Sequence, residues 1–297
     1  MIGPEHERAQ PPTGRGFTDA VTFAFGDERA GRYGMARLGL SLGEDQPAGS
    51  ALAVLFADRQ PVTAVSRGGL DVPEAAEWER LALGGVSMET LEPLRRWRVT
   101  LDGAQHGFDL TFEALGPPAE VAGGEALARA GGMAGYEHAC RVTGRVRTGG
   151  QAREVRCLGQ RGHAWGEQDW DRIDIARTVA AWPGEGPALA LSGIRPHGAL
   201  SHAEEPTWAA LLAADGPQPV AEPRLSTTYD GDGRQRRAGL ELWVHEEDAH
   251  PRRGSGEVLC GSTLDLGQLR LDCAFFRWRL DGAEGVGRYD VLRRAAA

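Results

Sequence analysis

The sequence contains no lysine; all 33 basic residues are arginine. Without a lysine amine the chain cannot form the Schiff base of the usual pyridoxal enzymes. It also lacks the lysine that clamps phosphate groups in P-loop proteins and kinases. These enzyme classes are excluded, and we attribute the arginine bias itself to a GC-rich genome.

Acidic residues outnumber basic ones, 42 to 33. The formal net charge is -9 and the sequence pI is about 5.5. Proteins that bind nucleic acids depend on clustered cations that contact the phosphates. We therefore predict no nucleic-acid partner.

The four cysteines form no CxxC pair, so a zinc ribbon is not expected. The N-terminus lacks the apolar stretch of a signal peptide, and the longest apolar run, residues 51–57, is too short to span a bilayer. We predict a cytoplasmic protein with reduced cysteines and no transmembrane segment.

Motifs for cofactors and metals are missing as well. No GxGxxG joins a strand to a helix, so a Rossmann domain is disfavoured. The histidine pairs His197/His202 and His245/His250 are too loosely spaced to predict a metal site. We expect neither a metal nor a cofactor.

Period-two alternation of apolar and polar residues is what the sequence has in quantity. It marks strands at residues 21–26, 107–114, 240–246 and 269–280, each bounded by Gly, Asp or Pro. Residues 73–83 and 125–130 are the only credible short helices. The chain is therefore predicted to be mainly β.

A stretch rich in Gly, Ala and Pro interrupts the strands near the middle of the chain. We predict a disordered polar leader at 1–15, an N-terminal β-barrel at 16–120, a linker at 121–134 and a C-terminal barrel at 135–297. The sequence does not indicate the oligomeric state.

Two strands around residues 149–150 are predicted to form a hairpin, because a Gly-Gly centre suits a two-residue turn. If Thr148 faces Gln151, all opposed residues have numbers that sum to 299. One face of the hairpin is then solvent-facing. The other face is apolar near the turn and carries Tyr136, His138, Arg161, His163 and Trp165 at its far end.

These clustered polar residues allow two readings. A group of polar side chains in a β interior is either a hydrogen-bonded network that closes a barrel end or a functional site. Histidine favours a site, since it exchanges protons near neutral pH.

The stretches YEHACRVTGRV (136–146) and GQRGHAWGEQDW (159–170), with the terminal GVGRYDVLRR (285–294), resemble the AttH-like and carotenoid 1,2-hydratase (hydroxyneurosporene synthase, CrtC-like) superfamily. The resemblance implies two lipocalin-like antiparallel β-barrels in tandem. It also implies enzymes that protonate an isoprenoid alkene or cyclise a polyene, with His163 and Trp165 at the bottom of the pocket. Many relatives have an aspartate immediately before the histidine, where this chain has Gly162.

Protonation of an alkene requires a strong acid in a dry pocket and aromatic faces that stabilise the cation. We predict Asp169 as the acid and His163 as the proton relay. The ligand-binding residues are predicted to be Tyr136, His138, Trp165 and Trp170. The competing interpretation makes Asp169 a turn or helix cap and Trp170 a plug.

Three hypotheses of function follow. The first is a barrel that binds a lipophilic, isoprenoid or polyene-like metabolite and acts as a hydratase (a lyase) or cyclase. The second is a non-catalytic carrier or sensor of a small apolar ligand, in which the carboxylate is ion-paired with arginine instead of being kept near His163. The third is a scaffold without a cavity.

Overall fold

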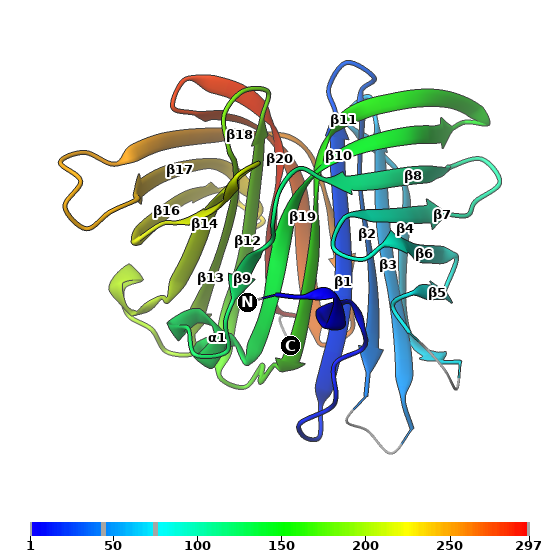
Figure 1. Cartoon of the computed structure of the whole chain (residues 1–297), viewed down its shortest axis with the longest axis horizontal. Helices are drawn as coiled ribbons and strands as arrows, with labels where there is room; N and C mark the ends of the chain where they lie inside the picture. The colour runs from blue at the N-terminus through cyan, green and yellow to red at the C-terminus, as the bar shows by residue number, and fades with distance from the viewer. Residues whose placement is uncertain (1, 43–45, 74–76, 296–297) are drawn as a thin grey trace. The chain divides into compact units, whose positions relative to one another are not determined.

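The structure is a computed structural model that describes residues 2–42, 46–73 and 77–295. Its residues fall into two compact units. Unit 1 comprises Met1–Ala122 and Gly132–Gln168, and unit 2 comprises Gly123–Gly131 and Asp169–Ala297. Each unit is built on one antiparallel sheet (Figure 1), which confirms the mainly β class and the tandem barrel architecture.

Unit 1 is a nearly closed barrel. Its strands pair in the order β4-β3-β2-β1-β11-β10-β8-β7-β6-β5, and β9 pairs with β10. The strands are β1 (Phe17–Asp27), β2 (Arg32–Ser41), β3 (Ala48–Ala57), β4 (Gln60–Asp71), β5 (Arg80–Leu83), β6 (Val86–Glu92), β7 (Arg96–Leu101), β8 (Gly107–Ala114), β9 (Ala119–Val121), β10 (Met133–Thr148) and β11 (Gln151–Glu167).

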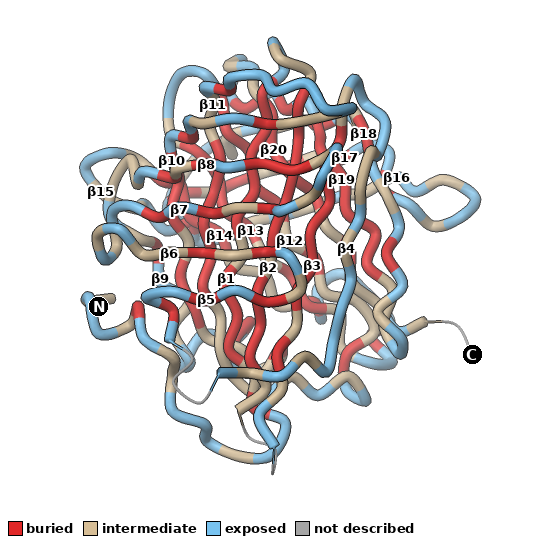
Figure 2. Tube along the Cα trace, turned by 90° about the vertical axis from the view of Figure 1, so that its right-hand side faces the viewer, coloured by how far each residue is buried: buried red, intermediate tan, exposed pale blue. Residues whose placement is uncertain are grey.

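The core of unit 1 is built from strands in which apolar and polar residues alternate. Every second residue of β1 from Val21 to Phe25 points into one apolar cluster, and Leu110 and Phe112 of β8 join it from the other side. Figure 2 shows the same alternation along β7, where buried and exposed positions succeed one another. Burial of these apolar faces is what drives the sheet to curl around them.

Unit 2 is a second antiparallel sheet with the order β15-β14-β13-β12-β20-β19-β18-β17-β16. Its elements are α1 (Ala126–Gly131), β12 (Ile173–Pro183), β13 (Ala188–Pro196), η2 (His202–Glu204), β14 (Thr207–Ala213), β15 (Gly216–Pro219), β16 (Glu222–Tyr229), β17 (Gln235–Trp243), β18 (Arg252–Asp265), β19 (Leu269–Leu280) and β20 (Ala283–Arg294).

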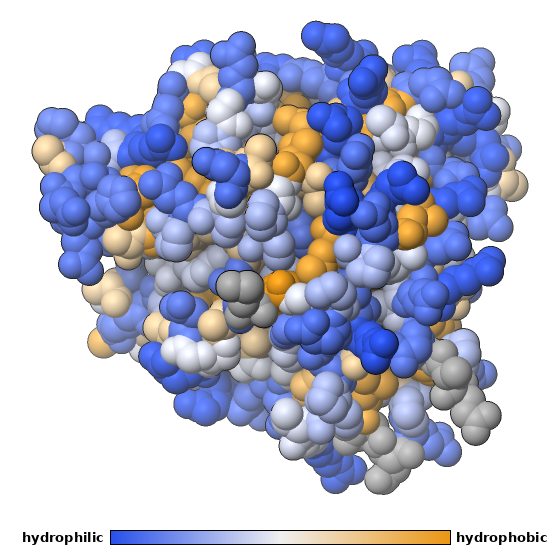
Figure 3. All heavy atoms as spheres, viewed as in Figure 1, coloured by the Kyte–Doolittle hydropathy of each residue, from blue (hydrophilic) through white to orange (hydrophobic). Residues whose placement is uncertain are grey.

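The helix predicted at 125–130 corresponds to α1. The helix predicted at 73–83 is wrong for its described part, because residues 80–83 form β5; residues 74–76 lie outside the described residues. No helix in the described part of the chain is long and apolar enough to cross a membrane. The face of the molecule in Figure 3 is mainly hydrophilic.

The division into units differs from the predicted boundary at 121–134. The hairpin of β10 and β11 belongs to unit 1, because β11 pairs with β1 and β10 pairs with β8. The segment read as a linker contributes α1 to unit 2 and the start of β10 to unit 1. The barrel that carries the histidine motif is therefore the first one, not the second.

Residues 2–15 of the leader predicted to be disordered are an ordered part of unit 1, and Met1 lies outside the described residues. Pro4–Glu7 form a 3-10 turn, η1, and the Glu7 side chain is 5% exposed. In Figure 1 this dark-blue turn lies next to β1, and the backbone N–H of Gln10 donates a hydrogen bond to Asp19 of that strand. The leader is ordered because its carboxylate has partners inside the barrel.

Candidate functional site

The hairpin of β10 and β11 has the predicted register. Thr148 pairs with Gln151, and the ladder runs without a slip to Tyr136 opposite His163. Both glycines of the turn have positive φ, as a two-residue hairpin turn requires. The register prediction is confirmed because the turn chemistry fixes the pairing.

The outer face of the hairpin is exposed only near the turn. Further along, Gln160 is 2% exposed, and its amide donates a hydrogen bond to the carboxylate of Glu137 at 2.6 Å. The prediction that this whole face meets solvent is therefore wrong at the end opposite the turn.

The interior of unit 1 becomes polar at that same end. Six buried side chains form what we call the polar cluster: Glu7, Asp19, Tyr136, His138, Arg161 and His163. Two fully buried indoles, those of Trp78 and Trp97, lie against it. Buried charges are stable only with hydrogen-bonding partners, so the contacts within the cluster determine its chemistry.

His163 lies at the centre of the cluster. Its Nε2 is 2.6 Å from Oδ1 of Asp19, and its Nδ1 is 3.2 Å from the hydroxyl of Tyr136. The other oxygen of Asp19 accepts hydrogen bonds from the indole N–H of Trp78 (3.0 Å) and the backbone N–H of Gln10 (2.8 Å). Asp19 is thus held in place to orient the imidazole.

The chain Asp19–His163–Tyr136–Glu7 can hold one extra proton. The Tyr136 hydroxyl has a single proton and three acceptors within reach: Nδ1 of His163, Oε1 of Glu7 at 3.0 Å and the carbonyl oxygen of His6 at 3.3 Å. If the hydroxyl donates to Glu7, its oxygen accepts a hydrogen bond from Nδ1 of His163, so Nδ1 is protonated and the Asp19–His163 pair holds two protons. If the hydroxyl donates to Nδ1, Nδ1 is unprotonated and the pair holds one proton. Two states that differ by one proton are what a general acid needs.

Burial sets the strength of this acid. It lowers the pKa of His163 below the ordinary value, and the hydrogen bond to Asp19 opposes that effect. Burial also raises the pKa of Tyr136, so the phenol stays protonated at neutral pH. The lowered pKa makes the imidazolium of His163 a stronger acid, and also the minor form at neutral pH; a protonated phenol can pass its proton on.

Glu7 is held by three donors. Nη2 of Arg161 (3.0 Å) and Nε1 of Trp97 (3.1 Å) donate to Oε2, while the Tyr136 hydroxyl donates to Oε1. The guanidinium lies over the rings of Trp97 and Tyr136, at 4.8 and 4.9 Å from their centroids. Because both charges are removed from water, each depends strongly on the other.

His138 is fully buried beside this pair. Neither ring nitrogen has a hydrogen-bond partner among the described residues, and the ring lies 5.2 Å from that of Trp97 and 5.6 Å from that of Tyr136. Burial, and then the charge of Arg161, lower the pKa of His138 well below 6.5. The imidazole is therefore neutral at physiological pH.

His138 should make the stability of the protein sensitive to acid. Its pKa is lower in the folded chain, so below pH 6.5 the unfolded chain binds a proton that the folded chain does not. The free energy of unfolding should then fall by up to about 1.4 kcal/mol per pH unit as the pH decreases from there. Urea unfolding of wild type and His138→Leu between pH 7 and pH 5 measures the difference. Parallel curves for the two proteins would contradict the prediction.

Trp165 connects the cluster to the surface. Its ring is half-buried and lies 5.1 Å from that of His163 and 6.0 Å from that of Tyr136. His6 of the leader is half-buried as well and lies 6.1 Å from Trp165. A ligand that approaches His163 from solvent would therefore meet these two rings first.

The structure places Asp169 and Trp170 outside the cluster. Both lie in the turn that opens unit 2. Asp169 is exposed, and its carboxylate accepts a hydrogen bond from the backbone N–H of Asp171. This is the turn-capping geometry of an aspartate. Of the predicted site residues, the structure thus brings together Tyr136, His138, His163 and Trp165.

Gly162 does not deprive His163 of a carboxylate. A side chain at position 162 would leave the strand on the opposite face from His163, where its Cβ would meet the carboxylate of Glu137 at 2.6 Å. The partner of the imidazole comes instead from the neighbouring strand β1, as Asp19.

Four residues of the cluster and its walls were not predicted from the sequence: Glu7, Asp19, Trp78 and Trp97. A signal for Asp19 was available, because it stands between Phe17 and Val21 on the apolar face of an alternating strand. No comparable signal marks Glu7, which lies in a polar leader.

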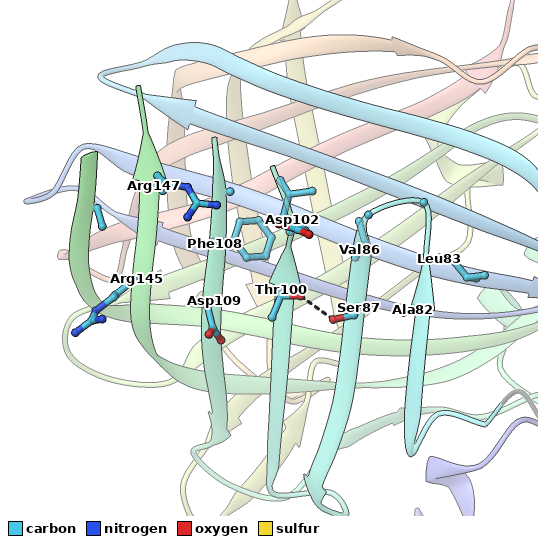
Figure 4. Close-up of a pocket in the computed structure, with 15 residues that line it drawn as sticks. Ala82, Leu83, Val86, Ser87, Thr100, Asp102, Phe108, Asp109, Arg145 and Arg147 are labelled. Atoms are coloured by element: carbon cyan, nitrogen blue, oxygen red, sulfur yellow. Dashed lines mark hydrogen bonds between the residues drawn. The ribbon is translucent and has the colours of Figure 1, made fainter. Parts of the chain in front are cut away.

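A surface groove of about 760 Å³ lies at the opposite end of β10 (Figure 4). Phe108 lies at its centre, and Arg145 and Arg147 flank it. Arg145 is paired with Glu154 at 2.7 Å, and Arg147 donates a hydrogen bond to the carbonyl oxygen of Gly103 at 2.6 Å. The groove shares no residue with the polar cluster.

Several solved structures have the same fold. An AttH-like protein from Nitrosomonas europaea is 11% identical, with a TM-score of 0.68 over 93% of this chain and 92% of that one. Kievitone hydratase from Nectria haematococca is 11% identical, with a TM-score of 0.64 over 98% and 93%. CghA, solved with Sch210972, is 12% identical, with a TM-score of 0.62 over 98% and 95%. The fold implied by the AttH-like resemblance is thereby confirmed.

Sequence comparison with curated proteins gives no significant match. A family model described as "Domain of unknown function (DUF7064)" matches residues 3–295, nearly the whole chain and both units. The chain therefore belongs to the DUF7064 family.

Proposed function

We propose that this protein binds a lipophilic, isoprenoid or polyene-like molecule in the barrel of unit 1 and hydrates or cyclises it by acid catalysis. The observation that carries the proposal is the buried Asp19–His163 pair, 2.6 Å apart, with Tyr136 on the other ring nitrogen. The fold shared with kievitone hydratase supports it.

In the proposed reaction the Asp19–His163 pair holds the proton. Nδ1 of His163 transfers it to the Tyr136 oxygen while the hydroxyl proton moves to an alkene carbon of the ligand. The resulting carbocation lies against the face of Trp165, a contact worth about 0.5 to 2 kcal/mol. Water adds to the cation in a hydration, or a second double bond adds to it in a cyclisation, and the proton released returns to Asp19–His163.

The same geometry offers a second function, that of a carrier. The Glu7–Arg161 ion pair is buried, with side chains that are 5% and 0% exposed, which matches the arginine-paired carboxylate expected of a carrier. A carrier would bind the ligand through the same aromatic walls and leave it unchanged.

Binding and turnover can be tested with one panel of terpenoids, carotenoid fragments, fatty acids and polyenes. We expect saturable quenching of tryptophan fluorescence in wild type and weaker quenching in His163→Ala and Trp165→Phe. Mass spectrometry of the bound lipophile should then show the addition of one water or a cyclic isomer.

Three other outcomes are informative. Quenching without a change in the ligand favours the carrier. Quenching that both variants retain in full would place the ligand elsewhere in the protein. No quenching over the whole panel favours the scaffold without a cavity.

A further inference from the structure

Glu7 is the one buried residue among residues 2–16. The segment around it runs over the end of the barrel and inserts this single carboxylate. Three contacts tie the segment to the cluster: the Glu7 carboxylate itself, the hydrogen bond from the Tyr136 hydroxyl to the carbonyl oxygen of His6 at 3.3 Å, and the hydrogen bond from the Gln10 N–H to Asp19. Glu7 makes the one charged contact of the three, so a group that replaces its charge would remove the part of the attachment that neutralises Arg161.

The side chains around Glu7 have more hydrogen-bond donors than the Glu7 carboxylate accepts from. Arg161 gives it only Nη2, while its Nε and Nη1 are buried and have no partner among the described residues. His138 lies opposite Arg161 in the ladder, and neither of its ring nitrogens has a partner among the described residues; in the neutral imidazole one of the two is a donor and the other an acceptor. Buried donors of this kind are costly, so they indicate a site for additional acceptor atoms.

The walls of this donor cage are aromatic. The rings of Trp97 and Tyr136 lie on the guanidinium of Arg161, and Cys140 and Val142, the next interior residues of β10, are fully buried in the apolar core. A guanidinium between aromatic faces suits a carboxylate attached to an apolar body better than a small inorganic anion.

We infer that the cage of Arg161, Tyr136, Trp97 and His138 is a carboxylate-binding subsite that Glu7 occupies in the absence of ligand. The ligand is then a lipophilic carboxylic acid, whose carboxylate replaces Glu7 as residues 4–10 move away. This inference rests on the proposed function and specifies its substrate class.

The test compares cis-parinaric acid, a fluorescent polyene acid, with its methyl ester in titrations of the full-length protein. Glu7→Gln removes the competing charge, so the acid should bind about tenfold or more tightly than to wild type, while the ester changes little. Glu5→Gln, in the same segment but with a side chain 71% exposed, is the control and should match wild type for both probes.

Gln10→Pro provides a second variant in case Glu7→Gln folds poorly. It removes the N–H that donates to Asp19 and loosens the segment while Glu7 is kept, so the acid should again gain affinity over the ester. Equal changes for acid and ester, or none, would overturn the inference and leave the proposed function standing. If neither probe binds any of the four proteins, both the inference and the proposed function fail.

Discussion

Asp19→Asn should lower the rate of hydration or cyclisation by about 100-fold or more, the usual contribution of a general acid. Asparagine can still accept a hydrogen bond from Nε2 of His163 at the position of Oδ1, so the imidazole keeps its orientation. It cannot hold the negative charge that stabilises the imidazolium or the proton that the pair stores. The rate is to be measured by mass spectrometry on whichever lipophile binds wild type.

Asp169→Asn is the comparison that decides between the two carboxylates. Asp169 is exposed in a turn, so we expect its replacement to leave the rate close to that of wild type. A large loss in Asp169→Asn together with full activity in Asp19→Asn would restore the assignment made from sequence alone. Circular dichroism of both variants establishes that the barrels remain folded.

Arg161→Met should destabilise the protein by about 3 to 5 kcal/mol, because it leaves the Glu7 carboxylate buried without its charged partner. Methionine fills much of the same volume, so the loss reflects charge and hydrogen bonding more than packing. Chemical unfolding followed by tryptophan fluorescence measures the change.

Two further variants make this result specific. Glu7→Gln combined with Arg161→Met removes both charges and should recover part of the loss. Arg98→Met breaks the ion pair with Asp109, whose side chains are 49% and 52% exposed, and should cost about 1 kcal/mol or less. A similar loss of stability in Arg98→Met and Arg161→Met would show that the buried ion pair contributes no more than an exposed one, and would contradict the prediction.

Much of the candidate site could be predicted because it is local. The Gly-Gly turn fixes the register of β10 and β11, and the register places Tyr136, His138 and His163 on one face. Of the four predicted ligand-binding residues, Tyr136 and Trp165 therefore lie against His163, and His138 lies against Tyr136. The fourth, Trp170, lies beyond the end of β11, where no ladder fixes its side chain.

Asp169 was predicted as the acid for a different reason, namely that it is close to His163 in the sequence. The carboxylates that reach the cluster come from much further away: Asp19 is separated from His163 by 144 positions and Glu7 from Arg161 by 154. Sequence distance is a poor guide in a barrel whose first strand pairs with its eleventh.

By itself, the sequence determined the β class, the strands with clear alternation, the hairpin and its register, because side-chain period and turn geometry are local properties of the chain. The tertiary structure alone decided which carboxylate faces His163, that the hairpin joins β1 to β8 in the first barrel, and that Glu7 of the leader neutralises Arg161. These outcomes depend on hydrogen-bond ladders between distant strands and on the need of every buried charge for a partner. Neither can be predicted from a short stretch of sequence.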